Sequence, residues 1–194
     1  MNSGKSKWPE NVTVDGDPLN NSNRRYMLKI FPKNSAQIKK EILVIMLNPS
    51  TADENKPDQT CEYLIKLCDY NGYNSLTICN LFPLRGNIKK LNEEIGNAND
   101  LSNDQKLYGC IAQFDEILCA WGQADKIKIK DRKAYNKRIR EVYIKLTNKK
   151  LREFGHSTFK GYKYPHHPRY TYIKSKESVI VEHKPDSKFY LGNV

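Results

Sequence analysis

Several features that would define a protein class are absent from this 194-residue sequence. No apolar run approaches the ~20 residues of a membrane-spanning helix, and the polar segment Met1–Glu10 has no apolar stretch of the signal-peptide type. There is no C-x-x-C pair and no histidine at zinc-ligand spacing, and the 5 cysteines are scattered among mostly apolar neighbours. We therefore expect a cytoplasmic protein with buried, reduced thiols, no membrane contact, no metal and no other cofactor.

The glycine-containing motifs of common nucleotide and ester chemistry are also missing. The sequence contains no G-x-G-x-x-G, no G-x-x-x-x-G-K-[ST] and no G-x-S-x-G. Dinucleotide-binding, P-loop and hydrolase-elbow interpretations therefore lose their main support.

Basic residues are in excess. The chain has 33 Lys and Arg against 22 Asp and Glu, which gives a formal net charge of +11. This balance favours polyanionic partners, because Lys and Arg neutralise phosphates in non-specific nucleic-acid binding. A competing explanation stays open, since a chain rich in Lys, Asn and Ile is also typical of AT-biased coding. The length suits one domain with a core of its own.

The apolar pattern divides the chain into three parts. Residues 1–24 are polar and are predicted to form a flexible arm, 25–174 a single α/β domain, and 175–194 a C-terminal extension with an edge strand near Val179–Val181. We predict strands over Arg25–Phe31, Ile42–Leu47, Ser75–Asn80 and Asp115–Trp121, a short strand after Gly155, extended structure over Tyr170–Ile173, and helices over Asp58–Tyr70, Asn99–Gln113 and Asp131–Phe154. The alternation predicts a three-layer sandwich with a central, mostly parallel sheet.

Polar turns follow four of the strand-like segments. They are Asn48-Pro-Ser-Thr-Ala-Asp53, Asn80-Leu-Phe-Pro83, Trp121-Gly122 and His166-His-Pro-Arg-Tyr170. In a parallel sheet such turns open at the same edge, so these distant residues are expected to converge. The plainer alternative is that the amide, hydroxyl and carboxylate of the first turn only cap the next helix.

The blocks M-L-N-P-S-T-A-D, N-L-F-P-L-R-G, C-A-W-G and H-P-x-Y carry a resemblance. Together they resemble the bacterial and phage family called domain of unknown function 1643, over roughly Arg25 to Ile173. That name implies no activity. The same order of turns is similar, more distantly, to the uracil-DNA glycosylase superfamily, which implies a glycosylase-like fold and a pocket for a flipped-out base.

The glycosylase resemblance implies a role for each turn. Asn48 would position the hydrolytic water, with Asp53 as an alternative carboxylate for this role, Asn80 would read the base, and His167 would stabilise the departing base. Residues expected to bind the substrate are Pro49, Ser50, Thr51, Asn80, Phe82, Arg85 and Trp121, and residues expected to contact phosphates are Lys133, Lys137, Arg138, Arg140 and Arg169.

Two departures from the glycosylase pattern affect the expected substrate. Asn48 stands where faster members have a more basic Asp, and Ser50 stands where uracil-specific members have a bulky ring, so a larger or modified base would fit. The leading hypothesis is a nucleobase-binding protein that hydrolyses the N-glycosidic bond of a uracil-like or modified base in nucleic acid, with DNA as the expected form. The alternatives are a non-catalytic nucleic-acid or nucleotide binding protein, and a hydrolase of small N-ribosides.

Overall fold

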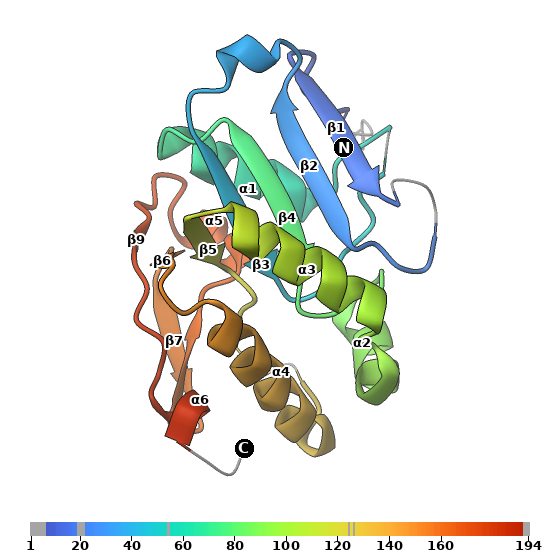
Figure 1. The fold of residues 1–194 in the computed structure, drawn as a ribbon, viewed down its shortest axis with the longest axis vertical. Helices are drawn as coiled ribbons and strands as arrows, with labels where there is room; N and C mark the ends of the chain where they lie inside the picture. The colour runs from blue at the N-terminus through green and yellow to red at the C-terminus, as the bar shows by residue number, and fades with distance from the viewer. Residues whose placement is uncertain (1–6, 19–21, 54, 124, 126, 192–194) are drawn as a thin grey trace.

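The structure is a computed structural model that describes residues 7–18, 22–53, 55–123, 125 and 127–191 (Figure 1). A seven-stranded sheet in the order β1-β2-β4-β3-β5-β6-β9 runs through its middle. The strands are β1 (Val12–Asp17), β2 (Met27–Pro32), β3 (Glu41–Met46), β4 (Ser75–Asn80), β5 (Glu116–Cys119), β6 (Lys150–Glu153) and β9 (Val181–Glu182).

The central strands β4, β3, β5 and β6 pair in parallel, and antiparallel strands complete both edges. Helices cover both faces of the sheet, so β3 reads as a nearly unbroken apolar run. Every residue of β4 is buried, including the polar Ser75, Thr77 and Asn80. The predicted α/β architecture with a mostly parallel central sheet flanked by helices is therefore confirmed.

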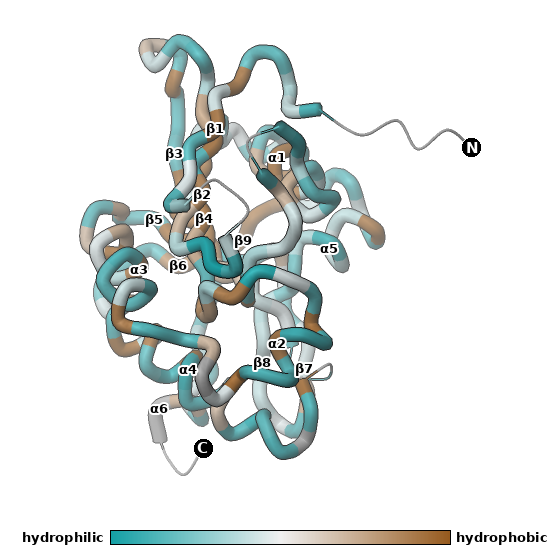
Figure 2. Tube along the Cα trace, turned by 90° about the vertical axis from the view of Figure 1, so that its right-hand side faces the viewer, coloured by the Kyte–Doolittle hydropathy of each residue, from teal (hydrophilic) through white to brown (hydrophobic). Residues whose placement is uncertain are grey.

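Helices lie on both sides of the sheet (Figure 2). On one side α1 (Gln59–Tyr70) lies beside α5 (Pro168–Lys174), and on the other lie α3 (Leu101–Gln113) and α4 (Arg132–Lys145). The remaining elements are α2 (Ile88–Glu94), α6 (Lys188–Leu191), the 3-10 turns η1 (Ser35–Gln37), η2 (Ile95–Asn97) and η4 (Ile129–Asp131), and a separate hairpin of β7 (His156–Phe159) and β8 (Tyr162–Pro165).

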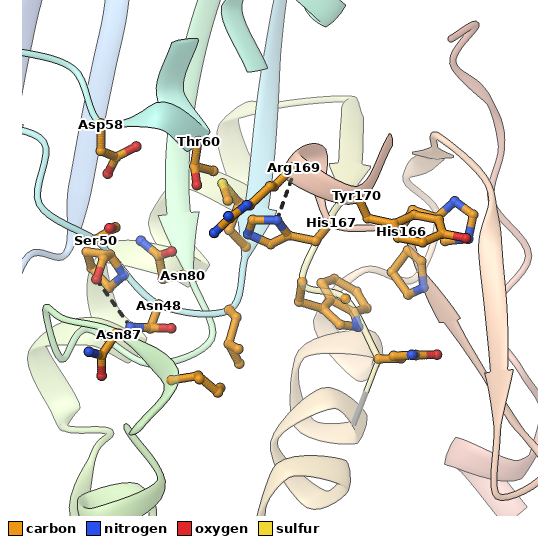
Figure 3. Close-up of a pocket in the computed structure, with 18 of the residues that line it drawn as sticks. Asn48, Ser50, Asp58, Thr60, Asn80, Asn87, His166, His167, Arg169 and Tyr170 are labelled. Atoms are coloured by element: carbon orange, nitrogen blue, oxygen red, sulfur yellow. Dashed lines mark hydrogen bonds between the residues drawn. The ribbon is translucent and has the colours of Figure 1, made fainter. Parts of the chain in front are cut away.

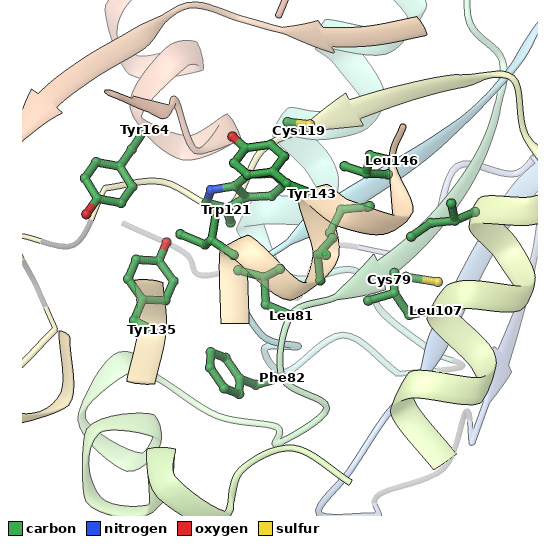
Figure 4. Packing of buried hydrophobic residues seen from close by; sticks show 14 of the residues in the cluster. Cys79, Leu81, Phe82, Leu107, Cys119, Trp121, Tyr135, Tyr143, Leu146 and Tyr164 are labelled. Carbon is green, nitrogen blue, oxygen red and sulfur yellow. The ribbon is translucent and has the colours of Figure 1, made fainter. Parts of the chain in front are cut away.

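The core on the α3 and α4 side is unusually aromatic (Figure 4). Helix α4 buries Tyr135, Ile139 and Tyr143, whose spacing places them on one helical face. The ring of Trp121 meets that of Tyr143 edge to face at 5.3 Å, and Tyr135 stacks on Tyr164 at 6.1 Å. This packing fixes the end of β5 against α4.

The N-terminal region differs from the prediction where the structure describes it. Residues 12–17 were predicted to belong to a flexible arm but form β1, which pairs with β2 along its whole length. An edge strand needs backbone hydrogen bonds more than apolar residues, and Val12 and Val14 still pack against the core. The same arm also contributes Trp8, whose Nε1–H donates to the carbonyl of Asp53 at 2.8 Å.

The predicted helix Asp131–Phe154 is too long. Helix α4 ends at Lys145, and Asn148 then adopts a left-handed φ of 69° that leads the chain into β6. Asn is one of the few residues with a side chain that adopts this conformation readily, so it acts as a helix terminator. The apolar spacing continued through Leu146 and Leu151, which concealed the change from helix to strand.

The C-terminal part also departs from expectation. Residues 170–173 were predicted to be extended but lie in α5, which begins with Pro168, a residue favoured in the first helical turn. In the C-terminal extension, β9 pairs antiparallel with β6 near the predicted edge strand, and the buried ring of Phe189 joins the core.

Candidate functional site

The strand order itself selects one position on the carboxyl edge of the sheet. After β3 the chain crosses to β4 on one side, whereas after β5 it crosses to β6 on the other. Ligands of open α/β sheets bind at such a switch point, beyond the carboxyl ends of the two strands. A cavity of about 580 Å³ lies there, within the size range of small-molecule sites (Figure 3).

The turn after β3 forms one wall of the cavity and is fixed by Asn48. The Nδ2 group of Asn48 donates to the backbone carbonyls of Gly86 at 2.9 Å, and of Leu84 and Pro49 at 3.2 Å each. These bonds join the β3 turn to the loop after β4 and set the orientation of the amide. Pro49 and Ser50, which also line the cavity, are held by the same turn.

Asn80, the last residue of β4, provides a buried amide. It pairs with Met46 across the sheet, is 2% exposed, and lines the cavity, where Figure 3 shows its side chain near Asn48 and Ser50. No group in the described part of the chain hydrogen-bonds to this side chain. Behind it, the Nδ2 of buried Asn103 in α3 donates to the carbonyls of Asn80 and Leu81 and anchors the strand end. A buried amide without a protein partner is suited to a polar ligand.

The loop before α5 brings His167 to the cavity. The Nδ1 of His167 accepts the backbone N–H of Arg169 at 3.2 Å, so in the neutral ring the proton lies on Nε2. Gly122 makes this placement possible: its φ is +84°, and a Cβ there would lie 3.3 Å from the Cβ of His167. The Trp121-Gly122 turn thus gives the cavity a buried ring and room for the histidine loop.

The cavity also contains charged residues. The side chain of Arg169 extends toward Thr60 and Asn80 in Figure 3. Arg25 is 2% exposed, lines the cavity and donates from Nη1 to the carbonyl of Ala52 at 2.6 Å. Its burial lowers the pKa of its guanidinium, although the nearby carboxylate of Asp58 acts in the opposite direction.

Asp58 places a carboxylate at the cavity, as does Asp125. Its Oδ1 accepts the N–H of Cys61 at 2.8 Å and caps α1, and its Oδ2 accepts the N–H of Ala52 at 3.2 Å. Asp53 does not line the cavity. Its Oδ1 instead accepts the N–H groups of Asn55 and Lys56 and closes a tight turn.

Of the residues predicted to form the site, the structure brings seven together around this cavity, namely Asn48, Pro49, Ser50, Asn80, Trp121, His167 and Arg169. Thr51 is exposed beside it and does not line it. Phe82 is 3% exposed and packs in the core, and the guanidinium of Arg85 donates to the carbonyl of Ala52 outside the cavity lining.

The basic helix α4 divides into inward and outward residues. Lys133 and Lys137 are exposed and Arg140 is half-buried, so these three remain accessible to a polyanion. Arg138 is 3% exposed and faces inward: its Nε donates to the carbonyl of Leu81 at 2.8 Å and its Nη2 pairs with Asp104 at 2.6 Å. A guanidinium used in this way links helices rather than contacting phosphate.

The cavity lining also includes polar residues that were not predicted, among them Arg25, Asp58, Ser157 and His166. Asp58 had a signal, since it begins a predicted helix shortly after the polar turn and so faces the same edge. His166 is adjacent to His167. Arg25 and Ser157 had no such signal, because each lies in a strand-like segment without a polar turn.

Two negative observations concern only the described residues. None of their His, Cys, Asp and Glu side chains form a group of three or more suited to a metal ion. Within the same residues, no helix combines the length and apolar character needed to cross a membrane. All five cysteines are free and buried, as their apolar neighbourhoods indicated.

Fold and cavity together define an α/β protein with a cavity at the switch point of a mostly parallel sheet, lined in part by polar side chains. The chain belongs to the family described as "Protein of unknown function (DUF1643)", whose profile matches residues 25–169. The match includes β2 to β8 and stops within the His-Pro loop and α5. Comparison with curated proteins gave no match to the chain. Comparison with solved structures gave none either.

Proposed function

We propose that the cavity binds a nucleobase and that the protein hydrolyses its N-glycosidic bond in nucleic acid, in the manner of the uracil-DNA glycosylases that its turns resemble. The observation that carries this proposal is the buried Asn80 amide, which faces the cavity and has no partner among the described residues. One amide offers a donor and an acceptor side by side, which matches the edge of a uracil-like base. Leaving such an amide unpaired is unfavourable, so a ligand that pairs with it is favoured.

Asn48 is suited to hold the attacking water. Because its Nδ2 is engaged by backbone carbonyls, its Oδ1 has a fixed direction and remains an acceptor for a water molecule. An amide is a weak base, so Asn48 orients the water without deprotonating it. The developing sugar cation makes a weak nucleophile sufficient, although the reaction is expected to be slow.

His167 is suited to stabilise the departing base. In the neutral ring whose Nδ1 accepts from Arg169, the proton lies on Nε2, which makes Nε2–H a hydrogen-bond donor. A donor aimed at an oxygen that gains negative charge lowers a reaction barrier by about 3–4 kcal/mol in well-studied hydrolases. Ser50 leaves room beside the base, which favours a modified pyrimidine over a pocket restricted to uracil.

Nucleic acid is the proposed source of the base. Arg169 lies at the cavity, and Lys133, Lys137 and Arg140 are accessible on α4, within a chain of net charge +11. Phosphate contacts from these residues would hold the strand while the base enters the cavity.

The test is base release from labelled oligonucleotides carrying uracil, mismatched thymine and modified pyrimidines. Abasic product is expected from the wild type, with a rate at least about 100-fold lower in Asn80→Ala and His167→Ala. Asn55→Ala is the matched control, since Asn55 is exposed and does not line the cavity. Equal rates of base release in the wild type and the three variants would contradict the roles assigned to Asn80 and His167.

A second candidate is a binding protein without hydrolysis. It is favoured by the hydrogen bonds of two carboxylates near the β3 turn. Asp53, the only carboxylate of that turn among the described residues, accepts N–H groups of its own turn. Asp58 caps a helix. This candidate predicts binding to oligonucleotides that weakens with salt and no abasic product. A protein that acts on small N-ribosides would instead show no binding to oligonucleotides at ~150 mM salt, where phosphate contacts are weak.

A further inference from the structure

A second pair of polar residues lines the cavity and is not used in the base recognition proposed above. Ser157 of β7 and His166, which follows β8, both face the cavity. The Oγ of Ser157 and the Nε2 of His166 lie 2.9 Å apart, within hydrogen-bond distance. A serine hydroxyl at this distance from an imidazole is the arrangement that activates serine as a nucleophile.

The hairpin and its neighbours hold this pair in place. The backbone N–H of His166 donates to the carbonyl of Gly155 at 2.7 Å. Gly155 has a φ of +113°, and a Cβ there would lie 3.2 Å from the Nδ1 of His166, so the imidazole lies directly against the glycine. The ring of Tyr170 packs on the imidazole with a centroid distance of 4.6 Å. The imidazole is therefore fixed by backbone and ring contacts before any ligand binds.

The protonation state of His166 fits a general base. Partial burial is the main influence and lowers the pKa of the imidazole, and the charges of Lys174 and His156 lower it further. The carboxylate of Glu153 and a hydrogen bond to the backbone of His156 act in the opposite direction without reversing the shift. The lowered pKa favours the neutral ring, and in the tautomer with its proton on Nδ1 the Nε2 accepts the Ser157 hydroxyl.

We propose that Ser157 and His166 form a nucleophile and general-base pair, which gives the cavity a second activity toward carboxylic esters small enough to enter it. Ser157 Oγ attacks the ester carbonyl carbon, and its proton moves to His166 Nε2 as the new C–O bond forms. Collapse of the tetrahedral species breaks the bond to the alkoxide, which takes the proton from His166. Water, deprotonated by the same imidazole, then releases the acid and restores the serine.

Two neighbours carry donors for the carbonyl oxygen as it gains negative charge. Arg169 and His167 line the same cavity and provide N–H groups. This activity does not depend on a nucleobase, so it stands or falls separately from the proposed glycosidic chemistry.

The test is covalent labelling with a fluorophosphonate. Ser157 Oγ would bond to phosphorus, fluoride would leave, and the hydroxyl proton would pass to His166. Intact mass and peptide mapping are expected to show one adduct, located on Ser157. Ser157→Ala should abolish the adduct and His166→Asn should slow its formation at least about 100-fold. Thr158→Ala is the control, because Thr158 is the exposed neighbour on β7 and does not line the cavity.

A second readout does not depend on the folding of any variant. The labelling rate of the wild type should fall as the pH is lowered from about 8 to about 5, since a protonated imidazole cannot accept the proton. The proposal would be overturned by the absence of an adduct or by an adduct on another residue. It would also be overturned by a labelling rate that changes neither with pH nor in His166→Asn. If Ser157 is labelled but no base is released from any oligonucleotide, the result would support the ester activity and contradict the proposed glycosylase function.

Discussion

The Nδ2 of Asn48 donates to the carbonyl of Gly86 at 2.9 Å and so joins the turn after β3 to the loop after β4. Two further carbonyls, of Leu84 and Pro49, lie 3.2 Å from the same nitrogen. A residue proposed to hold a catalytic water is thus also a structural link between two walls of the cavity. Its substitution will affect stability and activity together, and the two effects have to be measured separately.

Asn48→Asp is expected to be more destabilising than Asn48→Ala. Alanine removes the donor that the carbonyls of Leu84 and Gly86 share, a loss of about 1–2 kcal/mol in unfolding free energy. Aspartate would place carboxylate oxygens against the same carbonyls and lose more. Urea denaturation of both variants, with Asn55→Ala as the exposed control, measures the difference. An Asp variant as stable as the wild type would contradict the assigned orientation of the amide.

Gly122→Ala is expected to reduce ligand binding as well as stability. Alanine at a φ of +84° is strained by about 1 kcal/mol, and its Cβ would also lie 3.3 Å from the Cβ of His167 and displace that residue. Gly72→Ala is a matched control, because Gly72 has a φ of +81° and no neighbour within 4 Å of a Cβ. Both variants should lose similar thermal stability, but only Gly122→Ala should weaken oligonucleotide binding. Equal binding in the two would exclude a role for the contact.

The position of the site could be predicted from sequence because it depends on strand direction. The run Ile42–Leu47 is apolar throughout and indicates a buried parallel strand, and Ser75–Asn80, with Leu76, Ile78 and Cys79, is predicted as a second one. Parallel strands bring the turns that follow them to one edge. This reasoning placed Asn48 and Asn80 near one another, and they do line one cavity. His167 lines it too, but it follows β8 of the separate antiparallel hairpin, so the direction of the parallel strands does not explain its position.

The remaining details depend on side-chain geometry that spacing does not determine. Asp53 and Asp58 lie close together in the sequence, but only Asp58 lines the cavity. The carboxylate of Asp53 instead accepts a backbone N–H of its own turn. The inward position of Arg138 had a signal, since it shares a helical face with Tyr135 and Val142. The hairpin that carries Ser157 is short and mostly polar, so no periodic pattern placed it beside the sheet edge.

Arg138→Met is expected to destabilise the protein, whereas Lys137→Ala is not. Methionine retains much of the side-chain volume but removes the ion pair with Asp104 and one of the two donors to the Leu81 carbonyl, a loss of about 2 kcal/mol in unfolding free energy. Lys137 is exposed, so its loss should leave stability within about 0.5 kcal/mol. Urea denaturation gives the stabilities, and oligonucleotide binding at several salt concentrations gives the charge effect. A stable Arg138→Met that binds more weakly would show that Arg138 contacts phosphate after all.

Glu153 is expected to make folding sensitive to acid. Its carboxylate is 6% exposed and receives hydrogen bonds from Nδ1 of His183 at 2.5 Å and of His156 at 2.9 Å. Burial by itself would raise the pKa of Glu153, but the bonds to the two histidines outweigh it and hold the pKa below the ordinary value. A lowered folded-state pKa means that the ionised group stabilises the fold above the unfolded value, near pH 4.5, and that this contribution is lost as the pH falls toward the folded value.

Unfolding free energies measured by urea denaturation between about pH 3 and about pH 7 should therefore drop on the acid side in the wild type. Glu153→Gln should be less stable at neutral pH and should lack that part of the decline, while Glu182→Gln, an exposed position on β9, should follow the wild type. The same acid profile in Glu153→Gln and the wild type would assign the sensitivity to other carboxylates.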